Sequence, residues 1–216
     1  MSGPLRRLFY RATLGDHRYR FLFKPGPEGE LVSLDCETTG LNPRTDEVIA
    51  VAAVRIRGDR ILTSERFEEI VRSETSPSST SIKIHQLRAV DVEKGRPMRK
   101  ILPDLLRFIG GRPLVGYYID FDVRMLDKYV LGMIQAKLPN KQIDVSKIYY
   151  ELRYKNALEN TTFDLRFLTI LSDLGIPNLG QHDALNDAIM AAMIYLQLRD
   201  LKDRGKRLTG QRAKVK

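Results

Sequence analysis

The stretch LVSLDCETT (31–39) decides the fold of this chain. Its apolar residues lead into a polar end, which predicts a buried strand that brings Asp35 and Glu37 to the edge of a core. Side chains at i and i+2 leave a strand on the same face, with Cα atoms roughly 6.6 Å apart. Two carboxylates so placed repel one another unless a cation lies between them, and clustered carboxylates favour Mg²⁺ or Mn²⁺. The stretch therefore predicts a strand that ends at a candidate metal site.

Outward from this strand, hairpin-like strands come first, and strands then alternate with helices. The patterns predict strands within 47–62, up to about residue 71, in 112–119 and in 141–149. They predict helices over 98–111, 120–138, 161–175 and about 183–204. This order predicts an α/β fold, a mixed sheet with helices packed on it.

Two details of the helices are also predicted. Asp120 is a plausible cap for the helix over 120–138. Helical periodicity places five apolar residues on the inner face of the last helix, namely Leu185, Ile189, Ala192, Met193 and Leu196.

Composition bounds the class of protein. The chain has 216 residues, of which 43% are hydrophobic and 29% charged, so it is expected to form one globular domain rather than a fibrous or disordered chain. The single cysteine, Cys36, excludes a disulfide framework and a cysteine-based zinc site. Because Cys36 alternates with the two acids along the strand, we expect it to be a small core residue on the opposite face.

The sequence favours a cytoplasmic protein without membrane contact. No apolar run approaches the roughly 18 residues that a membrane-spanning helix needs. The start of the chain lacks the apolar core of a secretory signal. A transit peptide is the alternative, because Asp16 is the first acidic residue.

The net charge of +9 is concentrated at the two ends of the chain. Residues 1–29 hold six basic residues against two acidic ones, and residues 199–216 hold eight against two. A nearly neutral body with basic ends is typical of a protein that approaches a polyanion. Two solvated ends that keep the protein in solution are the alternative.

Three further residues are candidates for the same site. Asp122 follows the strand of 112–119 and opens a helix, where an acid can also simply complement the helix dipole. Asp187 lies on a helix face with Ala184, Met190 and Ala191, an unusual place for a charge unless it is neutralised. His182 precedes that helix, where a lone histidine is commonly structural.

The spacing of Asp35 and Glu37 is weak evidence when taken alone. The same D-x-E spacing recurs at Asp91 and Glu93, in a polar, helical segment that we expect to face solvent. Three acidic sites and one histidine, each at the edge of a buried element, are together the set that metal-assisted phosphodiester hydrolysis requires. Two ions roughly 3.5–4 Å apart would stabilise the attacking and leaving oxygens, and the histidine would take the proton of the attacking water.

Three segments in this order resemble the three exonuclease motifs of the DEDDh (DnaQ-like) 3′–5′ exonucleases, namely LVSLDCETTGLNP, LVGYYIDFDVRML and GQHDALNDA. That family includes the proofreading epsilon subunit of bacterial DNA polymerase III. The resemblance runs from about residue 30 to about 198. IKIHQL (82–87) is similar to a short segment of the family before its first helix, and IDVSKIYYEL (143–152) stands at the place of its fifth strand.

The resemblance implies an RNase H-like five-stranded sheet in the order 3-2-1-4-5, with strand 2 antiparallel. It implies that two Mg²⁺ or Mn²⁺ ions are bound by four acids and that a histidine is the general base. The ligands would be Asp35, Glu37, Asp122 and Asp187, and the base His182. It further implies that the terminal nucleotide is held around Thr38, Thr39 and Gly40, with His85 as a further candidate contact.

Two departures from the family stand out. Many relatives have His-Asn where this chain has Tyr117 and Tyr118, so a polar support of the site is replaced. After the last helix only GKRLTGQRAKVK follows, which favours a stand-alone exonuclease over a subunit bound to a DNA polymerase.

The N-terminal arm interleaves aromatic residues with Arg and His. The aromatic residues could stack single-stranded bases, or the arm could form a strand that pairs with the body. They are Phe9, Tyr10, Tyr19, Phe21 and Phe23.

The sequence therefore predicts a basic arm (1–29), an exonuclease domain (30–204) and a basic tail (205–216). The predicted activity is metal-dependent 3′–5′ hydrolysis of single-stranded ends, with DNA preferred, releasing nucleoside monophosphates. An exonuclease for RNA or oligoribonucleotides is the alternative, because nothing in the sequence recognises the sugar. A non-catalytic nucleic-acid-binding or polymerase-accessory module is the alternative from another class.

Overall fold

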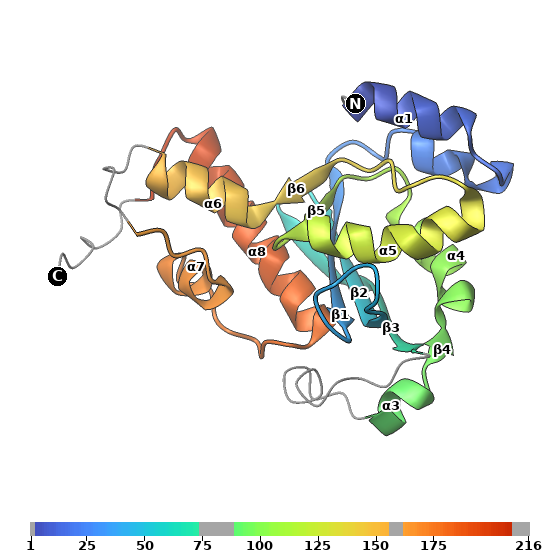
Figure 1. Ribbon diagram of the computed structural model, residues 1–216. Coiled ribbons are helices and arrows are strands. Elements are labelled where there is room, and N and C mark those ends of the chain that lie inside the picture. The colour runs from blue at the N-terminus through green and yellow to red at the C-terminus, as the bar shows by residue number, and fades with distance from the viewer. Residues whose placement is uncertain (1–2, 74–88, 156–161, 209–216) are drawn as a thin grey trace.

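The computed structural model describes residues 3–73, 89–155 and 162–208. Figure 1 shows a central sheet with helices on both sides. The elements follow the chain in the order α1 (Gly3–Ala12), the 3-10 helix η1 (His17–Phe23), β1 (Glu30–Thr38), β2 (Val48–Arg57), β3 (Arg60–Arg72), α3 (Ala89–Glu93), β4 (Arg96–Pro97), α4 (Met98–Ile109), β5 (Leu114–Gly116), α5 (Ile119–Ile134), β6 (Gln142–Asp144), α6 (Val145–Tyr154), α7 (Phe167–Asp173) and α8 (Ala184–Asp203).

The sheet has six strands in the order β4-β3-β2-β1-β5-β6. β2 is antiparallel to β1 and β3, whereas β1, β5 and β6 are parallel. The predicted order of five strands, 3-2-1-4-5, is confirmed by β3-β2-β1-β5-β6. The prediction of only five strands is wrong, because β4 adds two residues parallel to the end of β3. A strand of two residues carries no periodic pattern that a sequence could reveal.

β1 divides the core into two layers. Val32, Leu34 and Cys36 belong to the cluster that includes η1, α4 and α5, whereas Leu31 belongs to the cluster with α6, α7 and α8. Cys36 is buried, as predicted, on the face opposite to Asp35. The acids of β1 therefore face the layer of α8, which crosses the sheet in Figure 1.

The predicted inner face of α8 is partly correct: Ile189, Met193 and Leu196 pack against the core without being fully buried. Of the predicted residues only Ala192 is fully buried, and the others are half-buried. The fully buried set is richer in small residues: Ala184, Ala188, Met190, Ala191, Ala192, Ile194 and Leu198. The small residues among them let α8 approach β1 and β2 closely.

Three local predictions need correction. Tyr118, not Asp120, is the N-cap of α5, and Asp120 instead forms an ion pair with Arg124 on the helix surface. Of the strand predicted over 141–149 only β6 forms, because Asp144 accepts the backbone N–H of Ser146 at 3.0 Å and caps α6. The helices predicted over 120–138 and 161–175 are shorter, since α5 ends at residue 134 and α7 covers only residues 167–173.

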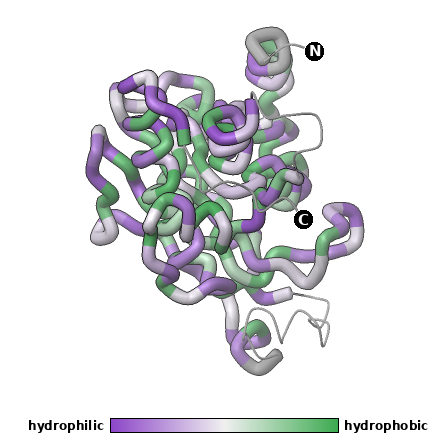
Figure 2. The backbone as a smooth tube through the Cα atoms, turned by 90° about the vertical axis from the view of Figure 1, so that its left-hand side faces the viewer, coloured by the Kyte–Doolittle hydropathy of each residue, from purple (hydrophilic) through white to green (hydrophobic). Residues whose placement is uncertain are grey.

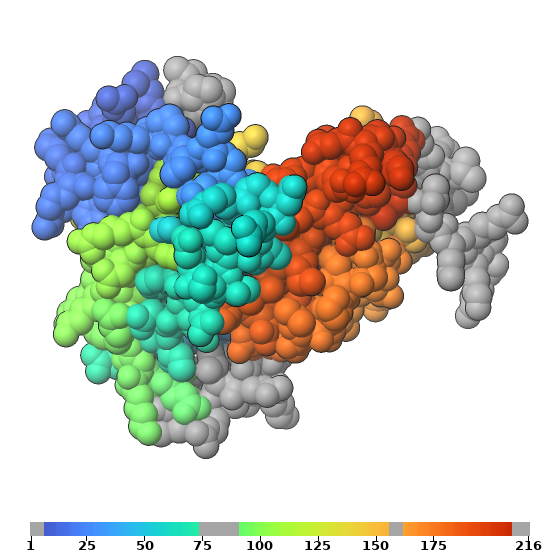
Figure 3. All heavy atoms as spheres, turned by 180° about the vertical axis from the view of Figure 1, so that it is seen from behind, coloured from blue at the N-terminus to red at the C-terminus, as the bar shows by residue number. Residues whose placement is uncertain are grey.

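The N-terminal residues are helical, so the alternative of a pairing strand is wrong. α1 and η1 cover most of the arm, and η1 buries Tyr19, Leu22 and Phe23 in the core next to α4 and α5. Asp16 caps η1 by accepting the backbone N–H of Arg18 at 3.0 Å. Figure 3 shows the N-terminal residues, in blue, lying against the body of the molecule.

Hydrophobic and hydrophilic residues alternate in short segments along the backbone (Figure 2). Among the residues that the structure describes, no helix has the length and apolar character needed to cross a lipid bilayer.

We expect Leu22→Ala to destabilise the whole domain, because Leu22 is 0% exposed within the core that α4 and α5 share. Loss of a buried leucine costs about 2–5 kcal/mol, which would lower the Tm by roughly 5–15 °C. Leu8→Ala is the control, since Leu8 lies on α1 and is 64% exposed. Equal Tm values for the two variants in thermal unfolding would contradict the integration of η1 into the core.

Candidate metal centre

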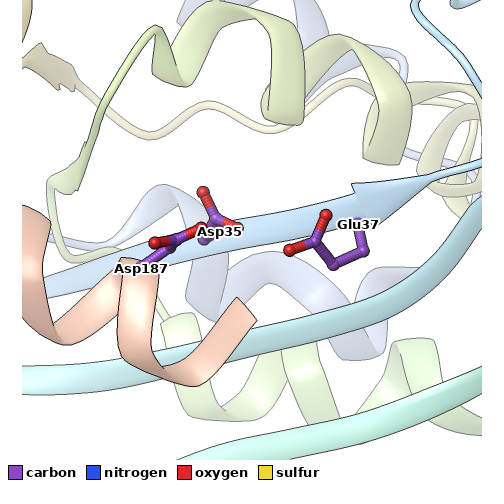
Figure 4. A group of neighbouring side chains, drawn as sticks. All are labelled: Asp35, Glu37 and Asp187. Carbon is purple, nitrogen blue, oxygen red and sulfur yellow. The ribbon is translucent and has the colours of Figure 1, made fainter. Parts of the chain in front are cut away.

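Three carboxylates from two distant segments converge beside the sheet. One oxygen each of Asp35, Glu37 and Asp187 lies within 4.8 Å of the others. Figure 4 shows Asp35 and Glu37 on β1 and Asp187 reaching them from α8. Glu37 is buried, and the other two side chains are half-buried. The group consists of carboxylate oxygens alone, the donors that hard divalent cations prefer.

The neighbouring strand leaves room for this group. Asp35 lies opposite Ala52 of β2, and Glu37 lies opposite Ala50. Directly paired residues project from the same face of an antiparallel pair. Because both partners are alanines, α8 can bring Asp187 over β1 without displacing a larger side chain.

The start of α8 is held by polar contacts. Asp183 caps the helix by accepting the backbone N–H of Asn186 at 2.9 Å. Asp187 accepts the backbone N–H of His182 at 3.0 Å, and His182 has the left-handed φ of 65° that this turn requires. The hydrogen bond within this turn therefore fixes the position of the Asp187 carboxylate.

Asp122 adjoins the group from the other layer. Its side chain is 4% exposed, and its Oδ1 accepts the backbone N–H of Cys36 at 3.1 Å, between Asp35 and Glu37. Gly116 lets β5 lie close to β1 and to the start of α5, because a Cβ there would lie 2.8 Å from Ile119 Cδ1 and 2.9 Å from the carbonyl oxygen of Leu34. Asp122 is not a member of the 4.8 Å group, but its carboxylate is bonded to the same stretch of β1.

The site strongly disfavours uncompensated negative charge. Burial, followed by the charges of Asp122, Glu37 and Asp187, raises the pKa of Asp35 well above its ordinary value. Burial also raises the pKa of Asp122 well above its ordinary value, against the backbone N–H groups that bind its carboxylate. A divalent cation would compensate these charges, so the donor set fits Mg²⁺ or Mn²⁺.

His182 lies at the rim of the site. Its side chain is exposed, and it lines a cavity of about 150 Å³ together with Glu37, Asp183 and the alanines of β2. His182 and the buried Glu37 therefore line one small cavity. Asp91 and Glu93, which repeat the D-x-E spacing, lie on α3 and do not belong to the carboxylate group.

The predicted nucleotide-binding residues form a tightly closed loop after β1. The Thr38 hydroxyl donates to the carbonyl oxygen of Gly40 at 2.7 Å, and Thr39 Oγ1 accepts the backbone N–H of Glu47 at 2.9 Å. The threonine side chains thus hold the loop itself. His85 lies outside the described residues.

Sequence reasoning missed Asp144 as a support of the site. Its buried Oδ1 accepts the backbone N–H of Tyr118 at 3.2 Å as well as the backbone and hydroxyl groups of Ser146. This contact fixes the chain one turn before Asp122. The D-x-S spacing of Asp144 and Ser146, typical of a helix cap, was the available signal.

Comparison with known proteins gives consistent matches. A family model for exonucleases, RNase_T, matches residues 32–195. The PolC-type DNA polymerase III of Thermotoga maritima is 26% identical over 170 residues, which are 79% of this chain but only 12% of that protein. The DNA polymerase III epsilon subunit of Aquifex aeolicus is 25% identical over 174 residues, covering 79% of this chain and 81% of that protein.

The fold also matches solved structures. E. coli exonuclease I in complex with a dA16 oligonucleotide has a TM-score of 0.68 and 14% identity, over 82% of this chain and 42% of that chain. At this identity the likeness shows a shared fold.

We expect Mn²⁺ or Mg²⁺ to raise the Tm, because a cation bound by the folded state alone stabilises it, by about 2.7 kcal/mol at 100 times its Kd. Asp35→Asn removes one of the repelling charges, so in a chelator this variant is expected to have a higher Tm than the wild type. When metal is added, the variant is expected to lose most of the rise in Tm that the wild type shows. Thermal unfolding with and without metal measures both effects. Equal metal-induced shifts in the wild type and the variant would argue against this site.

Proposed function

The chain belongs to the RNase_T exonuclease family, and on this premise we propose that it is a metal-dependent 3′–5′ exonuclease acting on single-stranded ends. It would release nucleoside monophosphates, with DNA as the preferred substrate. The proposed exonuclease domain, residues 30–204, contains the segment that matches the family model.

The convergence of the acids carries the proposal. Positions 35, 37 and 187 are distant in the chain, yet their carboxylate oxygens come within 4.8 Å of one another. A core of this size would normally bury apolar side chains here, since grouped carboxylates cost free energy without a cation. Their grouping is explained by a function that needs a concentrated positive charge.

We propose that Asp35, Glu37, Asp122 and Asp187 hold two Mg²⁺ or Mn²⁺ ions. When bound, the ions supply Lewis-acid stabilisation of the phosphate oxygens and of the attacking water. The chain orients its own ligands: Cys36 positions Asp122 through its N–H group, and His182 positions Asp187 in the same way.

His182 is proposed as the general base. Its exposed side chain lines the same cavity as Glu37, so its imidazole can accept a proton from a water that enters there. The left-handed backbone of His182 ties its side chain to the turn that carries Asp187. One short turn would thus supply both a ligand and the base.

The loop of Thr38, Thr39 and Gly40 is proposed to hold the terminal nucleotide through its backbone. The hydroxyl of Thr38 and the Oγ1 of Thr39 already bind within the loop, which makes it a preformed surface. His85 remains a predicted contact. The basic ends of the chain, residues 1–29 and 205–216, are proposed to attract the phosphate backbone.

The proposed preference for DNA follows the names of two relatives. The matched proteins of T. maritima and A. aeolicus are named for DNA polymerase III. Digestion of matched DNA and RNA oligomers labelled at the 5′ end tests the preference. Faster digestion of the RNA would establish the alternative of an RNA exonuclease.

Asp35→Asn and Glu37→Gln are each expected to reduce digestion of a 5′-labelled single strand at least about 100-fold, since each removes a proposed ligand. Asp91→Asn and Glu93→Gln are the matched controls, because they change the same residue types at the same spacing on α3. A ladder of products shortened from the 3′ end should appear with Mn²⁺ and vanish with a chelator. Wild-type rates in the first pair of variants would refute the site.

His182→Gln is expected to lower kcat by about 10²–10⁴-fold, which is the usual contribution of a general base. The metal-induced rise in Tm should persist, because the backbone N–H that binds Asp187 remains. Single-turnover digestion gives the rate, and thermal unfolding gives the control. A variant that keeps the wild-type kcat would exclude His182 as the base.

A further inference from the structure

A groove of about 530 Å³ runs between the end of β5 and the segment before α7. Tyr117 and Tyr118 line one wall, and Phe163, Asp164 and further residues up to Arg166 line the other. Its volume lies within the range of small-molecule sites, about 300–1,000 Å³. Figure 1 shows α6 and α7 on the same side of β5.

We propose that this groove binds an unpaired nucleobase of the 3′-terminal segment by stacking it on Tyr118 and Phe163. The inference rests on the proposed function, because it extends the substrate from the carboxylates into the groove. Tyr118 and Phe163 are each 48% exposed. Aromatic side chains beside a phosphate-binding site are typical of proteins that bind single-stranded nucleic acid.

The groove lies beside the start of α5, the helix that carries Asp122. Tyr118 lies one helical turn before Asp122, roughly 6 Å along the axis of α5. Its backbone N–H binds the buried carboxylate of Asp144 at 3.2 Å. The carboxyl ends of β1, β5 and β6 therefore bring the acids and the tyrosines to one edge of the sheet, where ligands of such sheets bind.

The tyrosine wall is held in a defined conformation. Tyr118 has the left-handed φ of 50°, which is rare for a bulky residue, and its carbonyl oxygen accepts the N–H of Phe121 at 2.9 Å. The Tyr117 ring lies 4.6 Å from the Tyr118 ring, and its hydroxyl donates to the carbonyl oxygen of Leu165 at 2.8 Å. That hydrogen bond joins the two walls across 48 residues of sequence.

The opposite wall is rigid as well. The Phe163 ring lies 5.2 Å from Tyr150 and 5.1 Å from Tyr154, in edge-to-face contacts with α6. The backbone N–H of Asp164 donates to the Tyr154 hydroxyl at 3.3 Å. A ring held in this way loses little conformational entropy when a base stacks on it.

The two charged side chains that line the groove, Asp164 and Arg166, neutralise each other. Arg166 binds both carboxylate oxygens of Asp164, at 3.0 Å through Nε and at 2.6 Å through Nη2. The ion pair neutralises the carboxylate that would otherwise repel a phosphate. Arg166 itself is mostly exposed at the end of the groove.

Binding of a 5′-fluorescein-labelled single-stranded DNA oligomer, followed by fluorescence anisotropy in EDTA, tests the proposal without the metal site. Tyr118→Ala and Phe163→Ala are expected to weaken binding by roughly 5- to 100-fold each, the usual effect of losing one stacking ring. Tyr118→Phe, which keeps the ring, should bind like the wild type. Leu131→Ala is the control, since Leu131 is 44% exposed near the far end of α5.

A scan with abasic nucleotides identifies the stacked base. In the wild type, removing one base near the 3′ end should weaken binding as much as Tyr118→Ala does. The variant should then be insensitive to that removal. If Phe163→Ala fails to fold, the measurements on Tyr118→Ala are sufficient to test the proposal.

The outcomes separate this inference from the proposed function. Wild-type affinity in Tyr118→Ala would overturn the proposal that the groove binds a nucleobase. A loss of affinity that is equal for every abasic oligomer would overturn it too, and the groove would then be assigned to an apolar segment of a protein. Ring-dependent binding without digestion in Mn²⁺ would uphold the groove and refute the exonuclease. Digestion by Tyr118→Ala with an unchanged KM would uphold the exonuclease and refute the binding of a base in the groove.

Discussion

Electrostatic repulsion among buried carboxylates is the constraint on which the rest of this structure depends. Asp35 and Glu37 leave the same face of a central strand, and Asp187 is brought against them by a helix from the far end of the chain. Burial and mutual charge raise the pKa of Asp35, so the fold keeps together groups that would separate in water. Such an arrangement persists only where the surrounding backbone determines it.

The scaffold meets this constraint with backbone N–H groups and small side chains. Asp122 is bound by the N–H of Cys36, and Asp187 by the N–H of His182. Alanines on β2 and on α8 leave the space in which the acids meet. Larger side chains at these positions would move α8 away from the sheet and separate the ligands. The fold and the proposed chemistry therefore depend on the same packing.

Tyr117 and Tyr118 connect the start of α5 with the surface beside it. Asp144 accepts the backbone N–H of Tyr118, and Tyr118 lines the groove next to the segment before α7. The hydroxyl of Tyr117 ties that groove to the segment before α7. These two tyrosines thus couple the start of the helix that carries Asp122 to the shape of the surface beside it.

Local patterns alone determined the strands β1 to β3, the approximate place of most helices and the choice of Asp35 and Glu37, because alternation and spacing are properties of a short segment. The motif order indicated the family. Only the tertiary structure decided which residues of α8 are buried, several alanines among them, that Asp144 supports Tyr118, and that Phe163 lines the same groove as Tyr118. These depend on how closely segments distant in the chain approach one another, and no local pattern records that distance.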